Sequence, residues 1–189
     1  MNKVPIQIMD LTTIKAVVFE LRQNIVPSRF ENAQQIDSHT VQLGFRTLEN
    51  LTWIEISWLA ESPRIVQIPP PKRYGEKSTL AKQLKHLLGN LALVEIQQTG
   101  FERIVRFKLS SRPGKEIEKE VVVELMGRHS NILLLDSSSK VVTLGKQIKE
   151  SHSRLRPIGT GDSYKSPPPL KGLAPNLSES FQTWKENIC

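Results

Sequence analysis

Short runs in which apolar and polar residues alternate are the feature that most constrains this 189-residue chain. Successive side chains of a strand point to opposite faces, so such runs predict half-buried strands. The runs form two groups on either side of Pro69-Pro70-Pro71, a triplet that cannot donate ladder hydrogen bonds and predicts an extended connector. The predicted strands span 29–36, 40–45, 53–58 and 64–68 before the triplet, and 92–99, 104–109, 120–126, 132–135 and 141–144 after it.

A predicted helix precedes each group of strands. Apolar residues recur at helical spacing over 11–25, with Asp10 as the expected N-cap. Ser78 is the expected cap of a second helix over 79–88, and Gly89 stands where that helix would end. Helix, four strands, helix, five strands predicts an α+β fold whose mostly antiparallel sheet closes into a sandwich or barrel-like core with two helices.

The composition excludes several classes of protein. Cys189 is the single cysteine, which excludes an internal disulfide framework and a cysteine-based zinc cluster. No run approaches the roughly 20 apolar residues of a membrane helix, and residues 1–22 carry no signal-peptide pattern. We therefore expect a soluble, cytoplasmic protein with no membrane partner.

Positive charge is concentrated in the second part of the chain. Residues 1–70 carry 6 Lys and Arg against 7 Asp and Glu, whereas residues 140–171 alone carry 7 against 2. Such clustering is typical of a protein that binds a polyanion such as nucleic acid. A solvated surface that keeps the protein soluble explains it equally well.

Motifs of conventional enzymes are missing from the sequence. It contains no phosphate-binding loop, dinucleotide fingerprint, nucleophile elbow or metal-spaced histidine pair. We therefore expect a protein that is not an enzyme and that holds no metal or cofactor.

Two polar stretches have both a functional and a structural interpretation. In Gly100-Phe101-Glu102-Arg103-Ile104 an acid and an arginine stand side by side at a strand entrance. An arginine offers a planar fork of donors suited to phosphate or base edges, yet the residues alone favour an ordinary turn with two solvated charges. The stretch Arg128 to Asn131 places four hydrogen-bonding residues between two apolar strands, as either a polar pocket facing RNA or a tight turn.

With these stretches the chain resembles the N-terminal domain of the NFACT family over about residues 9–169. Its members are ribosome quality-control proteins called RqcH in bacteria and NEMF in animals, with the older name fibronectin-binding protein A. Val123-Glu-Leu-Met-Gly-Arg-His-Ser-Asn-Ile-Leu-Leu is close to the family's V-E-I-M-G-R-H-S-N-I-I-L, and Gly100-Phe-Glu-Arg-Ile matches G-L-D-R-I. Supporting segments are the Asp10 helix start, Leu80 to Asn90 and Arg156 to Pro168, and the style of the match is similar to cyanobacterial members.

The resemblance implies a fold related to the N-terminal domain of formamidopyrimidine-DNA glycosylases and a function on the ribosome. The full-length protein would bind stalled large ribosomal subunits that carry peptidyl-tRNA, and would recruit alanyl-tRNA for C-terminal alanine tailing of the nascent chain. The family's tailing residues map onto Asp10, Glu102 and Arg103, which we expect to contact tRNA. Arg128, His129, Ser130 and Asn131 would form an adjoining RNA-facing pocket. Lys146, Lys149, Arg154 and Arg156 would contact phosphates.

The sequence departs from the family pattern at Glu102, where aspartate is usual, so the charge is kept while the side chain gains one methylene. Two alternatives stay open beside the ribosomal function. A DNA-lesion glycosylase is suggested by the fold kinship alone, but glycosylases need an N-terminal Pro-Glu and this chain begins Met-Asn-Lys-Val-Pro. A fibronectin-binding adhesin would need export, for which the sequence shows no signal.

The expected domain organisation has three parts. Residues 1–165 form the N-terminal domain, residues 166–177 are a proline-rich linker, and residues 178–189 begin a following helical, helix-hairpin-helix region that is cut short.

Overall fold

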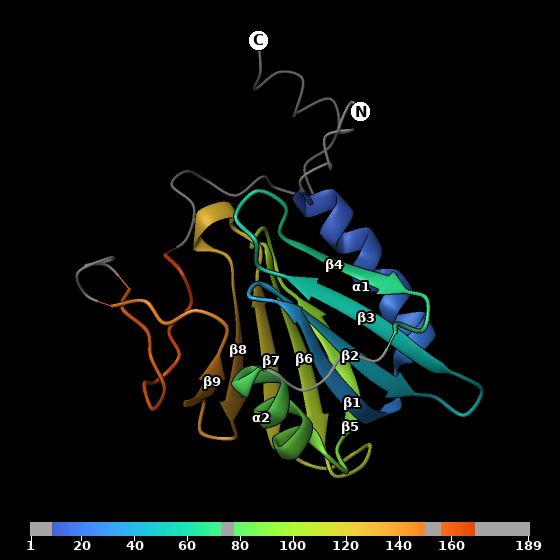
Figure 1. Cartoon of the computed structure of the whole chain (residues 1–189). Helices are drawn as coiled ribbons and strands as arrows, with labels where there is room; N and C mark the ends of the chain where they lie inside the picture. The colour runs from blue at the N-terminus through green and yellow to red at the C-terminus, as the bar shows by residue number, and fades with distance from the viewer. Residues whose placement is uncertain (1–8, 73–77, 150–155, 169–189) are drawn as a thin grey trace, which may run out of the picture.

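The computed structural model describes residues 9–72, 78–149 and 156–168 (Figure 1). The predicted linker lies mostly outside these residues, and the predicted C-terminal helix and Arg154 lie wholly outside them. The elements, in chain order, are α1 (Leu11–Ile25), β1 (Ser28–Asp37), β2 (Thr40–Arg46), β3 (Leu51–Ser57), β4 (Arg64–Ile68), α2 (Thr79–Leu88), β5 (Ala92–Gln98), β6 (Ile104–Ser110), β7 (Lys119–Glu124), the 3₁₀ turn η1 (Gly127–His129), β8 (Asn131–Asp136) and β9 (Val141–Leu144).

All the strands belong to one sheet of nine strands, in the order β4-β3-β2-β1-β5-β6-β7-β8-β9. Every neighbouring pair is antiparallel, which confirms the predicted α+β class. The two halves of the sheet are joined between β1 and β5, where only Ser28–Leu93 and Arg29–Ala92 are paired. The expected kinship with glycosylase domains stays a prediction.

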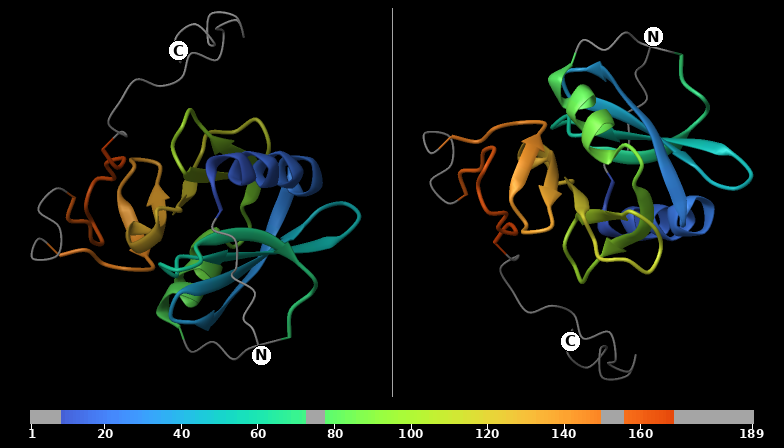
Figure 2. Two further views of the ribbon diagram at one scale, coloured as in Figure 1. Left: turned by 90° about the horizontal axis from the view of Figure 1, so that it is seen from above. Right: turned by 90° about the horizontal axis from the view of Figure 1, so that it is seen from below.

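The two halves of the sheet share one hydrophobic core, because inward side chains from both belong to a single buried cluster. Phe30, Leu43 and Ile54 of the first half join Phe107 and Val121 of the second. Seen end-on, the sheet curls around this core, as the predicted sandwich or barrel-like arrangement requires (Figure 2).

The two helices cover the open sides of the curled sheet. Helix α1 contacts β4 and β5, and helix α2 contacts β1 and β9. Both predicted N-caps are present, since the Asp10 carboxylate accepts from Thr13 N–H at 2.7 Å and Ser78 Oγ accepts from Ala81 N–H at 3.2 Å. No helix within residues 9–72, 78–149 and 156–168 is long and apolar enough to cross a membrane.

The outer face of β6 to β9 is covered by chain that follows β9. Ile158 packs with Val122, Leu133 and Leu135 in a second buried cluster, and Tyr164 packs against it. Backbone pairing also ties this segment to the sheet edge, where Val141 N–H donates to Asp162 O at 2.9 Å. The segment Arg156 to Ser166, called the cover segment below, is therefore part of the folded domain.

Strand β7 ends two residues earlier than expected, whereas β3 and β5 each end one residue early. The run 120–126 predicted a strand to Met126, but β7 ends at Glu124. Leu125 N–H still donates to Arg103 O at 2.9 Å, and Met126 N–H turns to the Ser130 hydroxyl at 2.9 Å, which starts the turn into η1. The apolar pattern continues through Leu125 because that side chain remains in the core.

Gly145 is expected to tolerate no side chain, because Trp58 packs directly on it. A Cβ there would lie 2.7 Å from Trp58 Cε2 and 2.9 Å from Ile132 Cγ2. We expect Gly145→Ala to lower the free energy of unfolding by about 1–3 kcal/mol, the usual cost of overpacking. Urea unfolding monitored by tryptophan fluorescence would measure it. A loss below 0.5 kcal/mol would contradict the predicted steric conflict, and Gly89→Ala, whose nearest contact is 3.2 Å, serves as the milder comparison.

Candidate functional site

Three polar segments lie at one end of the molecule: Asp10 at the start of α1, the β5–β6 turn over 99–103, and residues 126–131 around η1 (Figure 1, top). We call this set the polar end. Arg22 Nε donates to Ile96 O at 2.6 Å and the Lys15 ammonium lies 5.5 Å from the Phe101 ring centre. Helix α1 thus runs antiparallel to β5, which brings Asp10 toward the 99–103 turn. The bond from Leu125 N–H to Arg103 O brings residues 126–131 beside the same turn.

Asp10 is an exposed carboxylate with a structural partner. The hydrogen bond from Thr13 N–H holds the pKa of Asp10 below its ordinary value, so the group is ionised throughout the neutral range. One of its oxygens caps the helix, and the exposed position leaves the carboxylate accessible to a ligand.

The predicted pair Glu102 and Arg103 occupies the end of the β5–β6 turn. Both residues are half-exposed. Across the part of the chain that the structure describes, no hydrogen bond or ion pair engages either side chain. The turn itself is well braced, because the Gln98 amide donates to the carbonyls of Thr99, Gly100 and Glu102 at 3.2, 3.1 and 2.8 Å. Two unengaged opposite charges thus stand on a rigid turn.

The stretch Arg128 to Asn131 divides into two exposed and two buried residues. Arg128 and His129 are exposed, whereas Ser130 and Asn131 are fully buried. Asn131 Nδ2 donates to the Lys146 carbonyl at 2.8 Å, and Asn131 Oδ1 accepts from Lys146 N–H at 2.9 Å and from Ile132 N–H. Ser130 and Asn131 therefore hold the turn and do not line a pocket, and only Arg128 and His129 of the four can reach an RNA.

The residues expected to contact phosphate lie in different environments. Lys146 donates from Nζ to the Arg128 carbonyl at 2.8 Å and so stabilises η1, while Lys149 is exposed. Arg156 is largely buried, with its side chain 14% exposed, and forms a bidentate ion pair with Glu124 at 2.9 and 2.6 Å. The Arg156 guanidinium is engaged within the fold, so we do not carry this residue into the interface.

The ion pair of Glu124 and Arg156 anchors the cover segment, and Tyr164 completes it. The Tyr164 hydroxyl donates to Glu124 Oε1 at 2.9 Å, and the guanidinium carbons of Arg106 and Arg156 lie 5.0 and 5.2 Å from the centre of its ring. Burial, and next the Glu124 carboxylate, raise the pKa of Tyr164. Burial alone would lower the pKa of Arg156, but its hydrogen bonds and attraction to Glu124 outweigh that effect and raise it.

Sequence reasoning missed this network. Its one signal was Glu124, an acid that directly follows the apolar run Val121–Val123 and is buried with it at the end of β7. A charge in such a position needs a buried partner, but the sequence did not say that the partner stood at Arg156.

A cleft of about 800 Å³ lies along the cover segment. Lys149, Lys165, Ser163 and Ser166 line it, and Asp162 adds one carboxylate. Two exposed lysines and two hydroxyls are groups that bind phosphate, so the cleft extends the predicted polyanion surface beyond the polar end.

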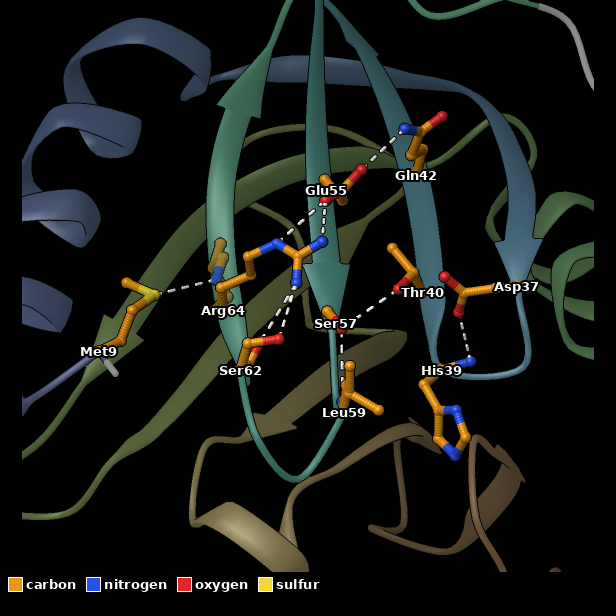
Figure 3. A network of polar contacts seen from close by, with 11 residues as sticks. Met9, Asp37, His39, Thr40, Gln42, Glu55, Ser57, Leu59, Ser62 and Arg64 are labelled. Carbon is orange, nitrogen blue, oxygen red and sulfur yellow. Dashed lines mark hydrogen bonds and ion pairs between the residues drawn. The ribbon is translucent and has the colours of Figure 1, made fainter. Parts of the chain in front are cut away.

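A second polar network, also missed from the sequence, crosses the outer face of β2, β3 and β4 (Figure 3). Gln42 Nε2 donates to Glu55 at 3.0 Å, and Arg64 donates to Glu55 at 3.1 and 2.7 Å and to Ser62 O at 3.2 Å. These contacts fix the turn between β3 and β4, whose Ala60 carbonyl lies near Gly127 of η1. By holding the β3–β4 turn beside η1, the network stabilises the part of the polar end that contains η1.

Arg106 and Lys108 alternate with buried residues on β6, and both of these basic side chains are paired with acids. Arg106 lies 3.1 Å from Glu120, and Lys108 lies 3.0 Å from Glu95. Within the described ranges the structure holds no group of three or more His, Cys, Asp or Glu placed to bind a metal ion.

Comparison with known families gives one match over almost the whole chain. The family described as NFACT N-terminal and middle domains matches residues 10–189. A protein named Rqc2 homolog RqcH from Streptococcus pneumoniae is 28% identical over 163 residues, which cover 84% of this chain and 30% of that protein. The protein of the same name from Bacillus subtilis is 37% identical over 94 residues, 48% of this chain and 16% of that protein. The chain thus spans less than a third of these relatives' length.

Two solved structures share the fold. The N-terminal domain of the fibronectin-binding protein PavA from Streptococcus pneumoniae superposes with a TM-score of 0.80 at 25% identity, covering 94% of this chain and 67% of that one. The N-terminal part of the fibronectin/fibrinogen-binding protein from Streptococcus suis also gives 0.80, at 24% identity, covering 93% and 67%.

Proposed function

Because the chain belongs to the NFACT family, we propose that it is the RNA-binding domain of a ribosome quality-control factor. The family match over residues 10–189 is the observation that carries this proposal. Under this proposal, the full-length protein binds large ribosomal subunits stalled with peptidyl-tRNA in the cytoplasm. It recruits alanyl-tRNA for tailing of the nascent chain, and this domain is a binding module without catalytic residues.

The polar end is the part of the domain that would contact tRNA. Arg103 offers an unengaged donor fork on a rigid turn, and Glu102 beside it can accept from a base amino group. Asp10 adds an ionised acceptor, and Arg128 with His129 adds further exposed polar groups. Donors and acceptors mixed at one place suit recognition of bases, whereas positive charge alone would suit only the backbone.

The cleft along the cover segment would take the phosphate backbone. Lys149 and Lys165 supply positive charge there without base contacts, so they would add affinity and no sequence preference. Each phosphate neutralised should steepen the fall of log affinity with log salt by about 0.7–0.9.

Co-sedimentation of the full-length parent with large ribosomal subunits on a sucrose gradient, followed by sequencing of the bound tRNA, tests the proposal. We expect the protein to travel with the large subunit and to enrich alanine tRNA over the cellular pool. Absence of the protein from the subunit fractions would contradict the ribosomal function. Subunit association with an unselected tRNA pool would contradict only the choice of alanine tRNA.

A second candidate function rests on the solved structures. The PavA domain that shares this fold is named as fibronectin-binding, and fibronectin binding by this chain is therefore a distinct hypothesis. Binding of the full-length protein to immobilised fibronectin at physiological salt would support it, and the subunit assay above is independent of that result.

A further inference from the structure

Phe101 is an aromatic residue that the hydrophobic core does not use. It stands at the tip of the β5–β6 turn, directly before Glu102 and Arg103, and is half-exposed. Its ring belongs to neither buried cluster and is not among the partly buried side chains packed against them. Packing within the described part of the chain therefore does not explain a large aromatic side chain at this position.

The backbone around Phe101 is held in one conformation. The three hydrogen bonds of the Gln98 amide brace the carbonyls on both sides of it. Gly100 has a φ of +61°, a conformation that a residue with a side chain rarely adopts, so the chain turns sharply just before the ring. The ring is thus presented in a fixed place, which lowers the entropy cost of any contact it makes.

One face of the ring already attracts a cation. The Lys15 ammonium, from α1, lies 5.5 Å from the ring centre, within the range of a cation–π contact. Lys15 is itself exposed, so an aromatic ring, an exposed positive charge, an acid and an arginine all stand within one turn and its facing helix. An aromatic surface beside basic and hydrogen-bonding groups is how proteins hold unpaired nucleobases, which stack on the ring while the polar groups bind base edges and phosphates.

We propose that Phe101 is a stacking platform for one unpaired nucleobase of RNA, which Glu102 and Arg103 hold from the side and Lys15 from α1. This assignment rests on the proposed function, and it adds the substrate class of the polar end: an unpaired nucleotide and not a duplex. Every base can stack on an aromatic ring, so Phe101 supplies affinity for any unpaired base. Glu102 and Arg103, which can hydrogen-bond to base edges, supply the selectivity among bases.

The test compares full-length Phe101→Leu, Phe101→Trp and Phe19→Leu with the wild type in binding of an alanine tRNA transcript, by fluorescence anisotropy over a salt series. Phe19 is the control, because it is a second exposed phenylalanine, with 63% of its surface exposed, and it lies on α1 and outside the β5–β6 turn. We expect Phe101→Leu to weaken tRNA binding about 10-fold, within the range of one lost stacked base. We expect Phe101→Trp to bind as tightly as the wild type, because it keeps an aromatic ring, and Phe19→Leu to leave the affinity unchanged.

The salt series separates stacking from a structural or an electrostatic role. Loss of a stacked base removes no phosphate contact, so Phe101→Leu should keep the wild-type slope of log affinity against log salt. Equal binding by Phe101→Leu and the wild type would overturn the proposal, as would a tryptophan variant that binds no better than the leucine variant. A wild type that does not bind tRNA would instead overturn the proposed function itself.

Discussion

Glu124→Ala is expected to be the most destabilising single substitution in this domain, with a loss of about 3–5 kcal/mol in the free energy of unfolding. The Glu124 side chain is 1% exposed and forms the bidentate pair with Arg156, whose side chain is 14% exposed. Removing the carboxylate takes the bidentate acceptor from a largely buried guanidinium and the hydrogen-bond acceptor from the Tyr164 hydroxyl. Urea unfolding followed by the fluorescence of Trp53 and Trp58 would measure the loss.

Two further variants show whether the buried charge causes the effect. Glu95→Ala breaks an ion pair with Lys108 that is more exposed, at 50% and 23%, and should cost about 0–1 kcal/mol. Glu124→Leu combined with Arg156→Met removes both charges and should recover much of the loss, because apolar pairs often replace buried ion pairs without penalty. A Glu124→Ala variant as stable as Glu95→Ala would contradict the anchoring role of the pair.

The helices and strands could be predicted from the sequence because their signals are local. Helix α1 spans 11–25 and helix α2 spans 79–88, as predicted. The signals were a cap residue for each helix, Asp10 and Ser78, the apolar spacing that follows each cap, and Pro27 after α1. The exact bounds of β4 and β9 followed in the same way from short apolar runs between turn residues. The end of β7 was wrong by two residues, since Leu125 is buried without belonging to the strand.

The contacts that shape the site could not be predicted, because they join residues far apart in the chain. Glu124 and Arg156 are 32 positions apart, and no periodicity connects them. The polar quartet Arg128 to Asn131 was ambiguous for a related reason. Burial decides which of its members face solvent, and burial depends on Lys146, which binds Asn131 from a later segment.

The residues of the polar end were identified as interface candidates by a different kind of evidence. Chemistry alone favoured an ordinary turn for Glu102 and Arg103, and only the family resemblance singled them out. The structure adds a physical reason to retain them, because no hydrogen bond or ion pair within residues 9–72, 78–149 and 156–168 engages their side chains, while Arg106, Lys108 and Arg156 are all paired. A charge that the fold does not neutralise is the one accessible to a ligand.

Arg103→Ala in the full-length parent is expected to lower tRNA occupancy on the large ribosomal subunit by about 10- to 100-fold, the cost of one or two charge-assisted hydrogen bonds. Because no hydrogen bond or ion pair within the described part of the fold uses the Arg103 side chain, the variant should unfold at nearly the same urea concentration as the wild type. Arg112→Ala is the matched control, since Arg112 is an exposed arginine in the β6–β7 loop at the opposite end of β6. Arg103→Lys keeps the charge and loses the planar fork, so it should restore the salt dependence but only part of the occupancy.

The same gradient assay separates tRNA selection from ribosome binding. If Arg103 contacts tRNA, its alanine variant still travels with the large subunit while the alanine tRNA is lost from those fractions, and Arg112→Ala retains both. Glu102→Asp should also retain both, because the shorter acid keeps the charge beside Arg103. Loss of the subunit together with the tRNA would instead place Arg103 at an rRNA contact, and full tRNA occupancy in Arg103→Ala would remove the polar end from tRNA binding. The second result would leave the family membership intact and move the search for the tRNA surface to the cleft of Lys149 and Lys165.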